Sequence, residues 1–206
     1  MTITYAITVC SEFIEIQRLI VFLLKHKRIQ DNIVVLFDSK NGDLEVENFL
    51  RIHSINEEFA WHKAEFKGHF ADWKNQLTSL CTGDYIFQID ADEMVTEYIC
   101  QVLPQILEAN QVDVIRVPRI NTVKGLTEQH VQRWGWQVND KGHVNFPDYQ
   151  WRIYRKADHI KWENKVHEVL TGYETISHLP LDTEFCLIHE KTIERQERQN
   201  EYYNTL

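Results

Sequence analysis

The residues best placed to do chemistry are two carboxylates two positions apart, Asp90 and Asp92, directly after the apolar stretch 85–89. Two carboxylates at this spacing can act on one divalent cation when the chain turns there. Oxygen ligands suit Mg²⁺ or Mn²⁺, and such a cation neutralises charge on a departing diphosphate. A solvated acidic turn has the same spacing, but the position after a buried strand, with Glu93 following, favours a functional site.

Alternating strand and helix signals fill the first half of the chain and position that acidic pair. Apolar runs typical of buried strands cover residues 3–9, 33–37, 59–66 and 85–89, the third being the weakest. Helical spacing of apolar side chains covers residues 13–27, 45–52 and 70–81. Ser11 offers an N-cap to the first of these helices.

Repeated strand–helix–strand units imply a parallel sheet with helices on both faces. Ligands of such sheets bind outside the carboxyl ends of the strands. Polar clusters at residues 10–12, 38–39 and 90–92 all follow predicted strands. The sequence therefore predicts one site at that edge of the sheet.

The pattern changes after the acidic pair. A helix is predicted over residues 97–109 and a strand over 112–118, and the stretch 121–144, rich in Trp, Gln, Gly and His, is predicted as a loop or lid. Further strand-like pieces cover residues 151–154, 160–162 and 184–188, and residues 191–203 form a charged, solvated helix. We expect one domain over residues 1–206, with two halves that meet near residue 110.

The composition limits the partners of this chain of 206 residues. Its formal net charge of −9 at pH 7 argues against broad attachment to nucleic acid or to an anionic membrane. A local basic groove stays possible, built from Lys63, Lys67, Lys74, Arg116, Arg119, Lys124, Arg133, Arg152, Arg155 and Lys165.

Membrane and redox signals are weak. The apolar run 19–24 is too short to span a bilayer, and the first residues lack the layout of a signal peptide. The four cysteines are scattered without a CxxC pair, which predicts reduced thiols. We therefore expect a cytoplasmic protein. Two variants of this location stay open: the inner face of a membrane, or the host cytoplasm if the protein is viral.

Three segments in order resemble the family 2 glycosyltransferases: FADWKNQL at 70–77, GDYI at 83–86 and DADE at 90–93. The turn at Asp38-Ser39 looks like the nucleotide-recognition turn of that family. The elements Val166-His167-Glu168 and Ile188-His189-Glu190 are similar to a small bacterial branch of lipopolysaccharide-core and phage enzymes. The resemblance covers about residues 3–190.

The resemblance implies a GT-A, Rossmann-like α/β fold. Its central sheet would be mostly parallel, with helices on both faces and a small C-terminal extension on the acceptor side. Residues 1–110 would bind the nucleotide-sugar, and residues 111–206 would form the acceptor half with a C-terminal helix.

The same resemblance implies roles for individual residues. Those expected to bind the nucleotide-sugar are Thr8, Glu12, Asp38, Lys74, Asn75, Asp90 and Arg152. Those expected to hold Mn²⁺ or Mg²⁺ are Asp92, Asp90, His189 and His167. Glu168 is the candidate general base that deprotonates the acceptor hydroxyl. Two departures are Ser11 in place of an Asn and Lys74 in place of an Arg, which keeps the charge and loses the bidentate fork.

Several of these residues have simpler interpretations. Asp38 fits a turn cap, Lys74 and Asn75 fit a solvated helix face, and Arg152 fits a strand flank. The histidines fit structural roles. The aromatic residues that either stack on a sugar or base, or form a small satellite core, are Trp134, Trp136, Tyr149 and Trp151.

The predicted function is an inverting, metal-dependent hexosyl- or pentosyltransferase with a nucleotide-sugar donor, a UDP-sugar being favoured. The acceptor is a surface saccharide or lipid-linked saccharide or, less favoured, a hydroxylated base in viral DNA. The alternatives are a catalytically inactive nucleotide-sugar-binding module and a metal-dependent phosphohydrolase or nucleotidyltransferase. The last would be expected to show a Gly-rich phosphate loop or a second carboxylate pair, and the seven glycines are dispersed.

Overall fold

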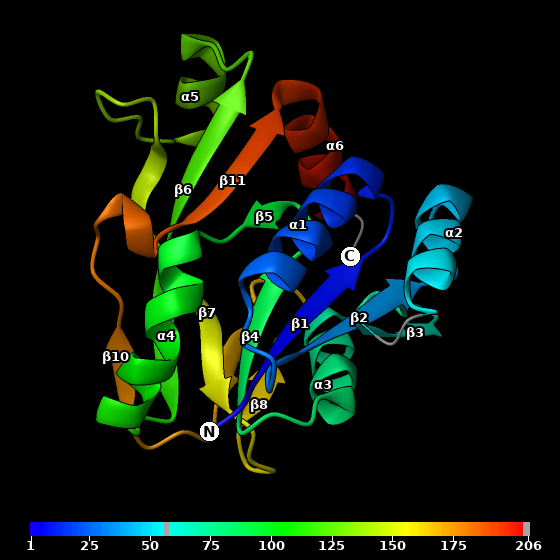
Figure 1. The fold of residues 1–206 in the computed structure, drawn as a ribbon. Coiled ribbons are helices and arrows are strands. Elements are labelled where there is room, and N and C mark those ends of the chain that lie inside the picture. The colour runs from blue at the N-terminus through cyan, green and yellow to red at the C-terminus, as the bar shows by residue number, and fades with distance from the viewer. Residues whose placement is uncertain (56–57, 204–206) are drawn as a thin grey trace.

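A computed structural model describes residues 1–55 and 58–203, and within them the chain forms an α/β fold around a nine-stranded sheet (Figure 1). In chain order the elements are β1 (Ile3–Val9), α1 (Phe13–His26), β2 (Asn32–Asp38), α2 (Leu44–His53), β3 (Ala60–Ala64), α3 (Phe70–Leu80), β4 (Tyr85–Asp90), β5 (Glu93–Met94), α4 (Glu97–Ala109), β6 (Val114–Lys124), α5 (Glu128–Trp134), β7 (Val144–Arg155), β8 (Lys161–Glu163), β9 (Val169–Thr171), β10 (Ile176–His178), a 3-10 turn (Thr183–Phe185), β11 (Leu187–Thr192) and α6 (Ile193–Tyr203).

The strand order is β3-β2-β1-β4-β7-β6-β11-β5, and β10 pairs with β6 beside this path. Strands β1 to β4 run parallel to one another, as do β6, β10 and β11, whereas β7 is antiparallel to both neighbours. The predicted fold class, a mostly parallel sheet with helices on both faces, is confirmed.

The register of the parallel strands aligns their carboxyl ends. Thr8 of β1 pairs with Leu36 of β2 on one side and with Asp90 of β4 on the other. Strands β1, β2 and β4 are buried on both faces, which is why they read as continuous apolar runs. The polar residues that follow these strands therefore come together at one edge of the sheet.

Two layers of side chains hold the sheet. Tyr5 and Ile7 point to a core shared with α1, α2 and α4, whereas Ala6 points to a second core with α3 and the β8–β9 hairpin. Gly83, between α3 and β4, passes so close to β1 that a Cβ there would lie 2.6 Å from the Thr4 backbone nitrogen. The Gly-Asp turn thus lets β4 run directly alongside β1.

The two predicted halves share this sheet, because β7 enters between β4 and β6. Their division near residue 110 stays a prediction. None of the helices within the described ranges combines the length and the apolar composition that crossing a bilayer requires. All four cysteines are free thiols, as predicted.

The stretch 121–144 is not a loop or lid throughout. Strand β6 continues to Lys124, and α5 follows, with β7 beginning at Val144. Thr127 and His130 form a capping box at the start of α5, each side chain accepting from the other residue's backbone N–H. Local capping and sheet pairing thus outweigh the loop-like composition.

Two smaller predictions are also wrong. The strand predicted at 184–188 is instead a 3-10 turn followed by β11, which begins at Leu187. The N-cap position of α1 is Glu12 rather than Ser11, and no side chain caps the helix there. The Glu12 carboxylate instead accepts from the backbone N–H groups of Cys10 and Ser11, which precede the helix.

Candidate functional site

A cavity of about 1030 Å³ lies at the carboxyl ends of β1, β2 and β4. It brings together ten of the predicted site residues: Thr8, Glu12, Asp38, Lys74, Asp90, Asp92, Arg152, His167, Glu168 and His189. Asn75 is the predicted residue that does not line it. The roles assigned to these side chains stay predictions, and their positions are consistent with one site.

Asp90 lies at the end of β4 and is held from two sides. Its Oδ2 accepts a hydrogen bond of 2.6 Å from the guanidinium of Arg152, and its Oδ1 lies 3.4 Å from the hydroxyl of Thr8. Burial raises the pKa of Asp90, but the charges of Arg152 and Lys74 outweigh burial and hold that pKa at about 2. The carboxylate is therefore ionised at neutral pH.

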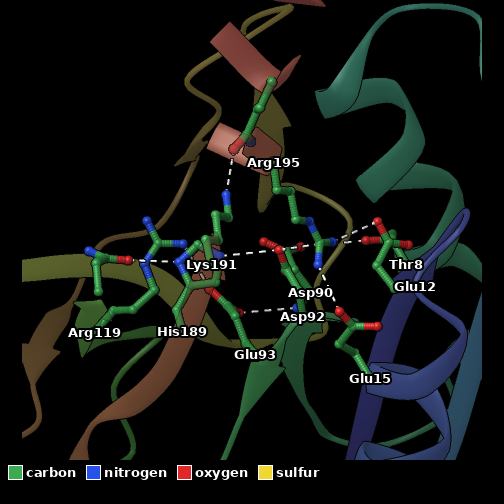
Figure 2. A network of polar contacts seen from close by, with 12 residues as sticks. Thr8, Glu12, Glu15, Asp90, Asp92, Glu93, Arg119, His189, Lys191 and Arg195 are labelled. Carbon is green, nitrogen blue, oxygen red and sulfur yellow. Dashed lines mark hydrogen bonds and ion pairs between the residues drawn. The ribbon is translucent and has the colours of Figure 1, made fainter. Parts of the chain in front are cut away.

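Glu93 is fully buried and lies at the centre of the charge network (Figure 2). Its Oε1 accepts from Arg152 at 2.6 Å and from Arg119 at 2.8 Å, and its Oε2 accepts from the backbone N–H of Asp90 at 3.1 Å. Arg152, only 2% exposed, thus bridges two carboxylates inside the protein. Its guanidinium positions Asp90, and its contact with the donor stays a prediction.

Asp92 faces the ring of His189, with 3.2 Å between its Oδ2 and the Nε2 atom. The Nδ1 of that ring lies 2.7 Å from Oδ1 of Asn121, an acceptor, so Nδ1 carries a proton. Burial works to raise the pKa of Asp92, yet the hydrogen bond and charge of His189 hold it well below its usual range.

This arrangement fits a divalent cation. Without a proton on Nε2, the ring of His189 would present a lone pair to a cation beside the carboxylate of Asp92, and Asn121 orients the ring as outer-shell partners of metal ligands do. Asp92 and His189 are therefore the residues that would hold Mn²⁺ or Mg²⁺. Among the described residues no three His, Cys, Asp or Glu side chains already converge as a metal site. His167 lines the same cavity and adopts a left-handed φ of 56° beside Glu168.

Glu168 reaches the cavity from the β8–β9 hairpin. Its Oε1 forms an ion pair of 2.6 Å with Lys74 of α3, whose ammonium also lies 4.5 Å from the ring centre of Trp162. Asn75 donates to the backbone carbonyl of Trp162 and accepts from its N–H, both at 2.9 Å. Lys74 and Asn75 therefore fasten the hairpin to α3 and orient Glu168.

Asp38 closes the turn after β2. Its Oδ1 accepts from the backbone N–H groups of Lys40 and Phe66, and its Oδ2 accepts from the side chain of Asn41. The turn-cap interpretation of Asp38 is thus what the hydrogen bonds show. Its contact with a nucleoside stays a prediction.

Helix α6 supplies a group of cavity-lining residues that the sequence pattern did not indicate. Arg195 of this helix contacts Asp92 at 3.3 Å, Glu12 at 3.1 Å and Glu15 at 2.9 Å (Figure 2). Five further α6 residues line the cavity: Gln196, Arg198, Gln199, Asn200 and Tyr202. The predicted solvated helix is therefore one wall of the site.

Other residues missed from the sequence share one face of two neighbouring strands. Asn121 of β6 pairs in register with His189 of β11, and Arg119 of β6 pairs with Asp148 of β7. Asp148 accepts from Arg119 at 2.8 Å, from Asn121 at 2.8 Å and from Gln150 at 2.6 Å. The alternation of side chains between the two faces of β6 was the available signal in the sequence. It does not indicate which residues meet unless the neighbouring strands and their register are known.

Aromatic side chains also line the cavity, among them Trp136, Trp151 and Trp162. Trp134 packs on Trp136 with ring centres 4.7 Å apart. Arg116 lies against the rings of Tyr149 and Trp151, at 5.6 and 5.1 Å. Arg116 is thus engaged by neighbouring aromatic rings.

The fold is similar to that of GT-A glycosyltransferases. The structure of S. aureus TarS 1-349 superposes with a TM-score of 0.62 at 12% identity, covering 92% of this chain and 60% of that one. Its complex with UDP-GlcNAc gives 0.63 at 13% identity (93% and 59%), and its complex with UDP gives 0.61 at 13% (92% and 60%). The chain spans about 60% of the length of TarS 1-349.

No family model and no curated protein matches the chain. At 12–13% identity the structural likeness shows the fold alone. The fold is that of a GT-A glycosyltransferase. The attribution to family 2 and to its small bacterial branch stays a prediction.

We predict that Glu93→Gln lowers the free energy of unfolding by about 3 kcal/mol, because the buried guanidinium of Arg152 and the partly buried one of Arg119 lose their shared carboxylate. Urea denaturation measures the change. Glu97→Gln is the control, since that side chain is 58% exposed and should change the value by less than about 0.5 kcal/mol. Equal effects of the two substitutions would contradict the central place of Glu93.

A second prediction concerns pH. Burial raises the pKa of Asp148, but Arg119 and the hydrogen bonds of Asn121 and Gln150 hold it below its usual value. The resulting stabilisation is present above the unfolded pKa of about 3.9 and is lost as pH falls through the lower folded pKa. The stability difference between wild type and Asp148→Asn should stay constant from about pH 7 to 5 and shrink below about pH 4.

Urea denaturation at each pH measures that difference, and Asp140→Asn, at an exposed position, is the matched control. For Asp140→Asn we expect a difference near zero throughout the range. A difference for Asp148→Asn that is constant down to about pH 3 would show that its contacts do not favour the ionised form.

Proposed function

We propose that this chain is an inverting, metal-dependent glycosyltransferase that moves a sugar from a UDP-sugar to an acceptor hydroxyl. The observation that carries the proposal is the convergence of Asp90, Asp92 and Glu168 in one cavity at the carboxyl ends of parallel strands. The GT-A fold supports it, since TarS structures of this fold include complexes with UDP-GlcNAc and UDP.

The donor would lie along the edge formed by β1, β2 and β4. The nucleoside end fits beside Thr8 and Asp38, and the diphosphate fits near Asp92. A divalent cation held by Asp92 and His189 would neutralise the negative charge that develops on the leaving diphosphate. Asp90 and Arg152 shape this part of the site by holding the end of β4 in place.

Glu168 suits the role of general base. Lys74 engages its Oε1, which leaves Oε2 to accept the proton of an acceptor hydroxyl. The deprotonated oxygen attacks the anomeric carbon as the bond from that carbon to the diphosphate breaks. This direct displacement inverts the anomeric centre, and the proton stays on Glu168.

We further propose that the transferred sugar is a hexose or a pentose and that the acceptor is a surface or lipid-linked saccharide. The apolar face of a sugar can stack on the aromatic walls of the cavity at Trp136 and Trp151. A DNA acceptor would need exposed basic residues for its phosphates. Arg119 and Arg152 are instead paired with carboxylates of the site, which disfavours that acceptor.

The first test is donor binding. We expect one UDP-sugar from a panel of UDP-, GDP-, CMP- and TDP-sugars to raise the melting temperature only with Mn²⁺ present. Asp92→Asn should lose this response, because the variant lacks the charged ligand that links cation and diphosphate. Glu163→Gln, at an exposed position of β8, should keep it. Absence of any nucleotide-sugar response, with or without metal, would reject the proposed function.

Once a donor and acceptor are known, Glu168→Gln should lower kcat about 10²- to 10⁴-fold, because the amide cannot take the proton. Donor affinity, measured by calorimetry, should change little, since the amide oxygen still accepts from Lys74. Glu163→Gln is again the control and should leave kcat unchanged. A variant Glu168→Gln as active as wild type would assign the base to another residue.

A further inference from the structure

The helix α6 is held over the donor edge of the cavity by polar contacts. None of its described side chains, at residues 193–202, is fully buried. Its contacts with the rest of the chain include Arg195 to three carboxylates, Gln199 to Lys191, and Glu197 to His130 at 3.7 Å. A helix anchored by such contacts can be released at a lower cost than one that buries an apolar face.

Arg195 lies where a cation would bind. Its guanidinium is 3.3 Å from Oδ2 of Asp92, the oxygen that also faces His189. The same guanidinium contacts Glu12 and Glu15 of the α1 region. Without it, three carboxylates from two parts of the chain would face one another with less compensating charge.

The rest of α6 follows the expected course of the donor. Tyr202, near the other end of the helix, lines the cavity together with Asp38 and Cys10. Burial, then the charges of Asp38 and Cys10, raise the pKa of Tyr202. The helix thus reaches from the acidic pair at β4 to the turn after β2, the two ends proposed for the donor.

We propose that Arg195 is an exchangeable counter-ion: it occupies the cation position beside Asp92 in the donor-free protein, and a divalent cation must displace it. The two positive charges cannot both lie against one carboxylate oxygen, because like charges a few ångströms apart repel strongly. Displacement frees the main anchor of α6, so cation binding loosens this helix over the donor edge. The inference rests on the cation site of the proposed function and not on the identity of the donor.

The test is the affinity of the donor-free protein for Mn²⁺, measured from the electron paramagnetic resonance signal of free Mn²⁺. Arg195→Gln should bind Mn²⁺ about fivefold more tightly than wild type, because the competing charge is gone. Arg133→Gln, the matched loss of an exposed arginine of α5 that does not line the cavity, should bind within about twofold of wild type. Arg195→Lys keeps a competing charge, and its affinity should lie between those of wild type and Arg195→Gln.

A second pair of variants, built on Asp92→Asn, tests whether Arg195 competes with Mn²⁺ at Asp92. In Asp92→Asn, adding Arg195→Gln should not tighten Mn²⁺ binding, since the shared partner has lost its charge. Circular dichroism and urea denaturation check that each variant folds. Hydrogen exchange of residues 193–203 should become faster when Mn²⁺ binds to the wild type.

Three results would overturn the inference. Equal Mn²⁺ affinity of wild type and Arg195→Gln would show that Arg195 does not compete, while the cation site itself would stand. A gain that survives Asp92→Asn would place the competition elsewhere. Slower exchange of α6 with Mn²⁺ would mean that cation binding closes the helix down. If no variant binds Mn²⁺, the cation site fails with the inference, and donor binding without metal tests the transferase separately.

Discussion

The buried carboxylate of Glu93 is the constraint on which the site depends. A fully buried charge is tolerated only when it is paired and hydrogen-bonded. Glu93 satisfies this through Arg152 of β7, Arg119 of β6 and the backbone of Asp90. The side chain thus ties β5, β6 and β7 to the end of β4 and fixes where the acidic pair lies relative to the second half of the chain.

Positively and negatively charged side chains alternate outward from Glu93. Arg152 forms ion pairs with Glu93 and Asp90, and Arg119 forms ion pairs with Glu93 and Asp148. Both guanidinium groups are therefore paired with carboxylates inside the protein, and the two arginines add little positive charge to the surface. The arrangement favours a compact, charge-balanced pocket for a small anionic donor over a basic surface for a polyanion.

The contacts that hold the site become more exposed from the sheet toward α6. The sheet side is held by buried strands and by nearly inaccessible ion pairs such as Arg152 with Glu93. The hairpin that carries Glu168 is fastened by paired hydrogen bonds from Asn75. The helix α6 depends on partly exposed ion pairs, which makes it the wall best suited to move when charge enters the cavity.

Much of the first half could be predicted because its signals are local. Apolar runs define β1, β2 and β4, and helical spacing predicts α1, α3 and α4 to within a residue or two. Asp90 and Asp92 follow from the end of β4 for the same reason. The second half was less predictable, since the capping box of α5 lies in an aromatic, loop-like composition and β7 pairs with strands far along the chain.

The sequence by itself determined the fold class and the position of the acidic pair at the end of a buried strand, because periodicity and composition act over a few neighbouring residues. Only the tertiary structure decided which charges meet. Arg195 and Glu12 are 183 positions apart, and Arg152 lies 59 positions from Glu93. Nothing in the spacing of such residues indicates their pairing. Their contacts follow from strand order and helix packing, which bring distant segments together at one edge of the sheet.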